Sequence, residues 1–164
     1  RRLSSMLDRL RTNKQRFKAG IADLPGLEFR ELSDPQGDIG TILTVILPTP
    51  EIAQGIANDL GSKVIAEAGW HVYSNMEHLL EQRVVNAVGC PFSCPHYTER
   101  GGQMRYWRGM LPQTDDLLAR SMNISIGVPD AGLGSAFGVS INDGPDVVDQ
   151  KAAEFRRVAG RYLS

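Results

Sequence analysis

The chain has 164 residues, of which 41% are hydrophobic and 23% charged, and its formal net charge is −1. This length supports a single globular domain, and the composition argues against a disordered chain and against a polyanion-binding surface, so nucleic acid is not an expected partner. No apolar run approaches the about 18 residues of a membrane span, no signal peptide opens the chain, and two cysteines agree with a reducing compartment. We therefore expect a cytoplasmic protein that does not contact a membrane.

The first 24 residues predict a long amphipathic helix that ends at Pro25-Gly26. Its apolar side chains recur at spacings of three, four or seven residues, with basic side chains mostly between them. These apolar residues are Leu3, Leu7, Leu10, Phe17, Ile21 and Leu24. Such a helix can belong to the core of this domain, or it can connect to a further domain that precedes it.

Two paired strands and a helix are predicted next. Residues 27–32 and the apolar run 39–48 flank a turn at residues 34–38, which is typical of neighbouring strands. Residues 50–61 then place apolar side chains on one face of a helix, which Thr49 caps and Gly61 ends.

The remainder mixes strands and helices without strict alternation. Short strands are predicted at residues 63–66, 70–73, 123–128 and 139–142, and helices at 76–83, 114–122 and 147–163. The predicted fold class is α+β, with a small, mostly antiparallel sheet and flanking helices.

The segment Gly89 to Tyr97, GCPFSCPHY, holds both cysteines of the chain. Cys90, Cys94 and His96 are potential zinc ligands, but structural zinc sites favour other cysteine spacings and need a fourth ligand. A redox pair favours two residues between its cysteines, and here there are three. The interpretation we favour is that two small apolar thiols hold a stiff, proline-rich loop, and we predict no metal site.

The residues after this loop are rich in hydrogen-bonding groups. His96, Tyr97, Arg100, Arg105 and Arg108 can bind a polar ligand, as loop residues often do. Equally, the aromatic residues of this segment can simply anchor an irregular segment in the core.

A second loop, GLGSAFG at 132–138, superficially resembles a phosphate-binding glycine loop but has neither known glycine order, so we expect a flexible connection between strands. From its residues alone, the chain offers no self-contained catalytic set.

The segment from residue 89 to residue 141 resembles the C-terminal part of the DegT/DnrJ/StrS family of pyridoxal-phosphate-dependent sugar aminotransferases. The resemblance rests on the cysteine-proline loop, on GMLPQTDDLLAR at residues 109–120, and on the strand NISI that follows. Upstream, the long helix and LPGLEF are similar to the entry into the small domain of fold-type I aminotransferases. The tail NISIGVPDAGLGSAFG resembles most the branch that aminates the C8 ketone of an eight-carbon, Kdo-type acid sugar.

The resemblance implies that residues 1–164 form one small C-terminal domain, with residues 1–24 as its connecting helix. In the family, the catalytic lysine and the pyridoxal phosphate site lie in a preceding large domain. None of the four lysines here matches that position: Lys14 and Lys18 are expected on the exposed side of the first helix, Lys63 before a strand, and Lys151 in the last helix. We therefore expect no catalytic residue in this chain, no stable binding of pyridoxal phosphate to it alone, and no activity of the isolated fragment.

The resemblance further implies a keto-sugar substrate, glutamate or glutamine as the amino donor, and a homodimer. His96 and Tyr97 would lie on a loop that faces the substrate, and an acid sugar would suit Arg100, Arg105 or Arg108 as partners of its carboxylate. The alternative is a stand-alone binding module that keeps the small-domain fold without catalysis. A small zinc-binding domain at Cys90, Cys94 and His96 is a third possibility.

Overall fold

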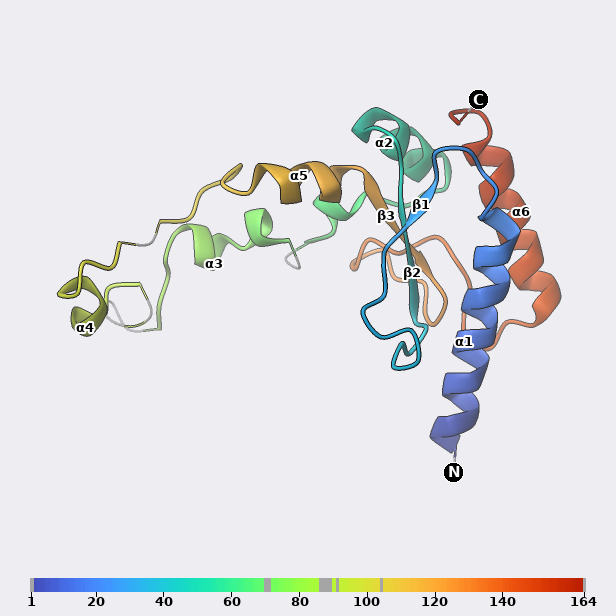
Figure 1. The fold of residues 1–164 in the computed structure, drawn as a ribbon, viewed down its shortest axis with the longest axis horizontal. Coiled ribbons are helices and arrows are strands. Elements are labelled where there is room, and N and C mark those ends of the chain that lie inside the picture. The colour runs from blue at the N-terminus through green and yellow to red at the C-terminus, as the bar shows by residue number, and fades with distance from the viewer. Residues whose placement is uncertain (1, 70–71, 86–89, 91, 104, 164) are drawn as a thin grey trace.

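A computed structural model describes residues 2–69, 72–85, 90, 92–103 and 105–163 of the chain. The described helices and strands form an α+β fold around a small sheet, as the sequence predicts (Figure 1). The principal helices are α1 (Arg2–Ile21), α2 (Pro50–Asp59), α5 (Pro112–Ala119) and α6 (Pro145–Ala159). The strands are β1 (Glu28–Phe29), β2 (Ile42–Ile46) and β3 (Ser121–Ser125).

The sheet is antiparallel and has β2 in the middle, in the order β1-β2-β3. Val45 pairs with Phe29 on one side and with Met122 on the other. Leu43 and Val45 are buried whereas Thr44 between them is only half-buried, which is the two-residue alternation of a strand with one face on the core. The sheet therefore buries one face and leaves Thr44, hydrogen bonded to Asn123 at 2.8 Å, on the other.

Helices α1 and α6 lie side by side and close the core (Figure 1). From Leu10 onward α1 contributes Leu10, Phe17 and Ile21 to this core, whereas Leu3 and Met6 nearer its start are exposed. The last two turns of the predicted N-terminal helix are thus core, and the helix ends at Ile21 rather than at Pro25. None of the described helices is long and apolar enough to cross a membrane.

Helix α2 and its cap agree with the sequence prediction. The Thr49 hydroxyl accepts a hydrogen bond from the Ile52 amide at 3.3 Å, and Pro50 opens the first turn. Gly61 follows the helix with φ of 64°, a left-handed conformation that ends helices readily.

Two of the predicted short strands are wrong in the described residues. In 63–66, Val64 makes one isolated bridge to Met122, and the chain then enters a 3-10 helix, η1 (Ile65–Glu67), whose amides bond three residues back. In 139–142, the Val139 and Ile141 amides donate to carbonyls of Ser125 and Gly127, but the Ser140 amide donates to the Asp143 carboxylate, so no ladder continues.

The boundaries of three more elements differ from the prediction. Helix α5 stops at Ala119, because the Arg120 carbonyl accepts from the Leu47 amide at 2.8 Å and its guanidinium donates to the Leu47 carbonyl at 3.0 Å. The chain is thereby tied to the end of β2, and Ser121 and Met122 join β3 instead of the helix. The predicted helix 76–83 is shorter, as α3 (Glu77–Leu80), and the closing helix begins and ends a few residues early, as α6.

The predicted strand 70–73 falls partly outside the described residues. Its last residue, Tyr73, begins a second 3-10 helix, η3 (Tyr73–Asn75). The Asn75 amide group holds this turn against the body by donating to the carbonyls of Ala66 and Gly69.

Gly138 is the position where the backbone leaves least room. Its φ is 142°, and a Cβ there would collide with the Ser125 backbone, to which Gly138 bridges in parallel. We expect Gly138→Ala to lower the free energy of unfolding by about 1–3 kcal/mol. Urea denaturation followed by circular dichroism measures the change.

Gly127→Ala is the matched control. Gly127 is also buried beside β3, but its φ is ordinary, and a Cβ would lie 3.6 Å from the Leu10 side chain, a normal contact. Equal losses of stability in the two variants would contradict the assigned backbone constraint.

Candidate functional site

An arm of residues 73–111 extends away from the body and carries most of the residues that the sequence singles out (Figure 1). It begins at η3, runs through α3, reaches the short helix α4 (Pro95–Thr98) and returns to α5. None of its described residues is buried. The described part of the arm therefore has no core of its own.

A hollow of about 500 Å³ lies at the outer end of the arm, around α4. We refer to it as the tip hollow; it is lined by Cys90, Cys94, His96, Tyr97, Arg100 and Gly102. Three of the five predicted substrate-binding residues, His96, Tyr97 and Arg100, thus surround one space. Their side chains offer an imidazole, a phenol and a guanidinium, which suit the hydroxyl and carboxylate groups of a polar ligand.

Local packing positions the tip hollow. Pro95 opens α4, and the amides of Tyr97 and Thr98 donate to the Cys94 carbonyl at 2.9 and 3.0 Å. The chain then turns back, with the Gly102 amide bonded to the Tyr97 carbonyl at 2.9 Å. A Cβ at Gly102 would lie 2.5 Å from the Tyr97 ring, so only glycine lets the ring lie flat against this turn.

The other two predicted residues lie elsewhere on the arm. Arg105 is exposed and does not line the tip hollow. Arg108 lies near the base of the arm, where it donates to the Asn75 side chain at 3.3 Å and lines a separate hollow with Ser74 and Asp115. The structure thus brings together three of the five residues and separates Arg108 from them.

The base of the arm is fixed to α5 by Tyr73. Its hydroxyl donates to the Asp115 carboxylate at 2.9 Å and accepts from the Leu111 amide at 3.3 Å. Burial, together with the bond to Asp115, raises the pKa of the Tyr73 phenol. Near the tip, Phe92 and Tyr106 stack edge to face, with ring centroids 5.9 Å apart. The outgoing and returning segments of the arm therefore contact each other there.

The two cysteines are free and interact with each other. A hydrogen bond between the thiols raises the pKa of Cys90 and lowers that of Cys94, and backbone amides of His96 and Tyr97 lower the Cys94 value further. Within the described residues, no three His, Cys, Asp or Glu side chains are grouped so that they could hold a metal ion. The cysteine pair is thus not part of a metal cluster in the part of the chain that the structure describes.

The GLGSAFG loop holds itself in shape by internal bonds. The Asp130 carboxylate accepts from the amides of Gly132 and Leu133 at 2.7 and 3.1 Å, and Asp130 bridges to Ser135. A carboxylate thus occupies the amides that a phosphate would need, which supports the interpretation of this loop as a connection.

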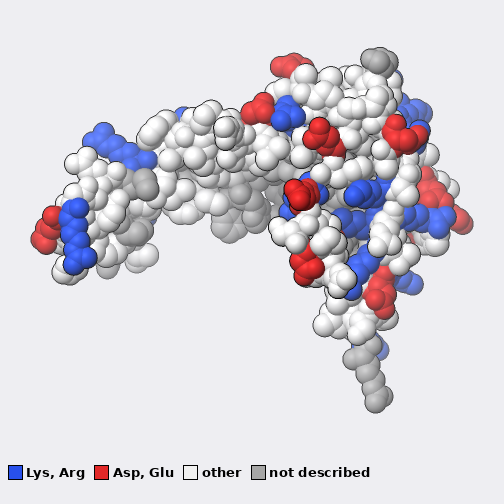
Figure 2. Space-filling model, viewed as in Figure 1, with Lys and Arg blue, Asp and Glu red and all other residues white. Residues whose placement is uncertain are grey.

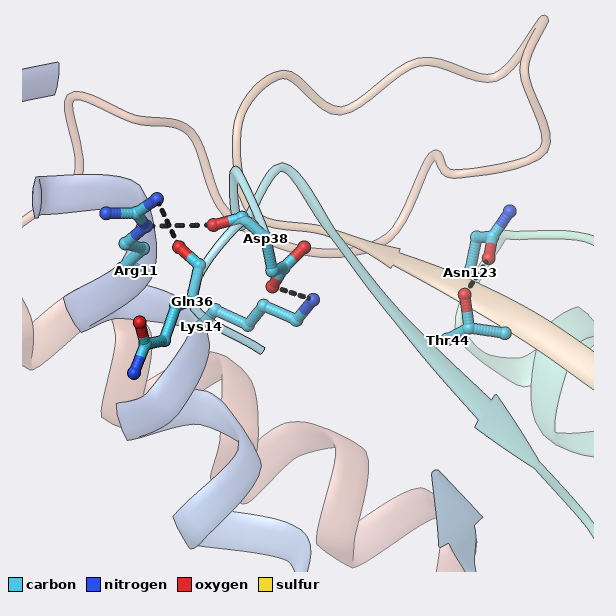
Figure 3. A network of polar contacts seen from close by, with 6 residues as sticks. All are labelled: Arg11, Lys14, Gln36, Asp38, Thr44 and Asn123. Atoms are coloured by element: carbon cyan, nitrogen blue, oxygen red, sulfur yellow. Dashed lines mark hydrogen bonds and ion pairs between the residues drawn. The ribbon is translucent and has the colours of Figure 1, made fainter. Parts of the chain in front are cut away.

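Lys14 corrects one expectation from the sequence. It is only 8% exposed, not on the solvent side of α1, and its ammonium group binds the Asp38 carboxylate at 2.6 Å (Figure 3). Lys18, one turn further, is exposed as expected and lies over the Phe29 ring at 4.6 Å from its centroid. Nothing in the sequence pattern separates Lys14 from the other basic residues of α1, because its partner is 24 residues away.

No known protein-family model matches this chain. The assignment of residues to the candidate site is therefore supported by their geometry and by the sequence resemblance.

The thiol pair predicts an order of reactivity. Because the thiolate is the nucleophile, we expect iodoacetamide to modify Cys94 before Cys90 at neutral pH, although Cys90 is the more exposed of the two. Peptide mass spectrometry after timed alkylation measures both rates. In Cys90→Ser, Cys94 should be alkylated more slowly than in the unmodified chain. Faster modification of Cys90 than of Cys94 in the unmodified chain would contradict the assignment.

The buried ion pair predicts a loss of stability in acid. Burial by itself would raise the pKa of Asp38, but the hydrogen bond and charge of Lys14 outweigh it and lower the pKa. The contribution of this carboxylate is therefore complete above its unfolded pKa of about 3.9 and is lost as the pH falls through the lower folded value.

Urea unfolding at several pH values from neutral to acid measures this contribution. Asp38→Asn should flatten the fall in unfolding free energy below about pH 4. Asp8→Asn, which changes an exposed carboxylate on α1, the helix of Lys14, should follow the unmodified chain. An unchanged pH dependence in Asp38→Asn would contradict the role of the pair.

Proposed function

We propose that this chain is the small C-terminal domain of a pyridoxal-phosphate-dependent aminotransferase that transfers an amino group from glutamate or glutamine to a keto sugar. The sugar is an acid sugar of the eight-carbon, Kdo type. The proposal rests on the sequence resemblance of residues 89–141 and on one structural observation, the arm without a core.

The arm is the observation that carries the proposal. Its described residues are all at least partly exposed, and large apolar side chains among them face solvent, including Trp107 at 59% and Leu111 at 42% exposed. On the face drawn in Figure 2, the middle of the arm is largely uncharged, and charged side chains gather at its outer end. A segment of this kind needs another protein surface to cover it, which suits a small domain that closes over the active site of a larger assembly.

The tip hollow suits the substrate side of such a site. His96 and Tyr97 can hydrogen bond sugar hydroxyls, and Arg100 can bind the carboxylate of an acid sugar. Closure of the arm would also exclude water from the reacting groups.

No lysine is among the described residues that line the tip hollow. Lys14 and Lys151 are paired with Asp38 and Glu154, and no lysine lies on the arm. We therefore derive no catalytic step from this chain. In the proposal, pyridoxal phosphate and the lysine that carries it belong to a large domain upstream, and the active enzyme is a homodimer.

The test uses the complete gene product that contains this chain. We expect it to form 2-oxoglutarate from glutamate only when an acid keto sugar is present, measured by a coupled dehydrogenase assay. Arg100→Ala should raise KM for the sugar by about 10-fold or more, because it removes a charged hydrogen-bond donor to the carboxylate, and should leave KM for glutamate unchanged.

Arg83→Ala is the matched control. Arg83 is an exposed arginine of the same arm, but it pairs with Glu81 and does not line the tip hollow. Absence of amino transfer by the complete protein, with the sugar supplied, would overturn the proposed function. Transfer with equal KM values in the two variants would remove Arg100 from the substrate site and keep the function.

A further inference from the structure

A second hollow, of about 230 Å³, lies in the body of the domain, between α1 and the segment that contains β1 and β2. We call it the α1 hollow. It is lined by Arg11, Lys14, Gln15, Lys18, Phe29, Arg30, Leu32, Pro35, Asp38, Leu43 and Thr44. None of these residues belongs to the arm, so the α1 hollow is separate from the tip hollow.

Four cationic side chains converge on the α1 hollow. Arg11, Lys14 and Lys18 follow one another at spacings of three and four residues along α1, so they share one face of the helix. Arg30 approaches from the other side, directly after β1. Figure 2 shows lysine and arginine side chains gathered on this face of the body.

Among the described residues that line the hollow, Asp38 alone is acidic. Asp38 binds Lys14 and so neutralises one of the four charges. Arg11 donates to the backbone carbonyls of Asp38 and Gln36, at 2.8 and 2.9 Å, which carry no charge (Figure 3). The guanidinium of Arg11 is therefore held in place without being neutralised.

Arg30 is near enough to Asp38 for its charge to lower the pKa of that carboxylate, but the two form no ion pair. In the part of the chain that the structure describes, no ion pair joins Arg11, Lys18 or Arg30 to an acidic side chain. Glu31 and Asp34 line an adjacent hollow, which Arg30 and Asp38 also line. The lining residues thus leave an excess of three positive charges around a space of molecular size, an arrangement that concentrates anions.

The shape and walls of the hollow narrow the ligand class. Phe29, Leu32 and Leu43 supply apolar surface beside the cations, so part of the ligand is apolar or a ring face. The volume is below the about 300 Å³ at which most ligand pockets begin, so the ligand is compact. Three cationic donors around one space suit a group with two negative charges and several terminal oxygens better than a single carboxylate.

We propose that the α1 hollow binds the phosphate group of a small phosphate monoester, with Arg11, Lys18 and Arg30 as the donors. The Lys14–Asp38 ion pair lines the same hollow. This site does not depend on the proposed aminotransferase function, because it uses none of the residues of the arm. It gives the domain a second ligand site.

Isothermal titration calorimetry of the purified chain tests the proposal, with glycerol 3-phosphate and inorganic phosphate as probes at constant ionic strength. We expect saturable binding of both probes. In a second series of titrations at higher salt concentration, the binding should be weaker. Lys18→Gln and Arg30→Gln should each raise Kd by about 10-fold or more, since each removes a charged hydrogen bond. Both side chains are exposed, so the variants should fold, which circular dichroism checks.

Arg9→Gln is the control, because Arg9 is an exposed arginine of the same helix that does not line the hollow. An equal rise in Kd for Arg9→Gln would show a diffuse surface charge effect and overturn the site. Absence of saturable binding of either probe would overturn it as well. Succinate binding as tightly as glycerol 3-phosphate would overturn the assignment to phosphate.

Discussion

Three phenylalanine rings connect the two ends of the chain, and the rest of the body is arranged around them. Phe17 from α1 and Phe155 from α6 are fully buried, and Phe137 lies against both, with centroid distances of 6.5 and 6.3 Å. Because α1 and α6 are far apart in the sequence, this contact closes the domain only when nearly the whole chain is present. The aliphatic side of β2 and β3, with Val45 and Ile124, packs into the same core.

The arm, in contrast to the body, is not held by buried side chains among its described residues. It leaves the body after Val72 and returns at α5 without contributing a buried side chain from its described residues. Among its described residues, the internal contacts include short-range turns, the Phe92–Tyr106 ring pair, and the bond of Arg108 to Asn75. Few buried apolar contacts mean low local stability, so the body fixes the base of the arm through Tyr73 and leaves the tip without comparable support.

The sequence predicted those elements whose signals are local. The apolar spacing of α1 and α6, the Thr49 cap of α2 and the strand pair around the 34–38 turn depend on neighbouring residues, and all are found. The segment 139–142 is predicted as a strand, but the Ser140 amide donates to the Asp143 carboxylate and no ladder continues. The parallel bridge of Gly138 to Ser125 likewise depends on a contact across the fold. The expectation that Lys14 is exposed is wrong for a similar reason. Lys14 pairs with Asp38, which lies outside the helix and so does not appear in a helical pattern.

The candidate site shows a similar division. The predicted residues His96, Tyr97 and Arg100 lie around one hollow because they are close in sequence, in and just after the short helix α4. Arg108 is a predicted residue too, yet it belongs to the base of the arm, because its position depends on Asn75, 33 residues earlier. The sequence pattern does not predict the α1 hollow, since Arg30 and Asp38 reach α1 through contacts between segments that are distant in sequence.

The contrast between the two hollows has a consequence for binding. The α1 hollow is built on a helix that packs into the core, and two backbone carbonyls hold Arg11, so this donor is placed before any ligand arrives, whereas Lys18 and Arg30 are exposed. Such preorganisation lowers the ordering cost of binding. The tip hollow lacks a rigid support of this kind, so part of the binding free energy there must order the arm unless another protein surface does so first. Binding at the tip should therefore be coupled to assembly, whereas binding at the α1 hollow should not.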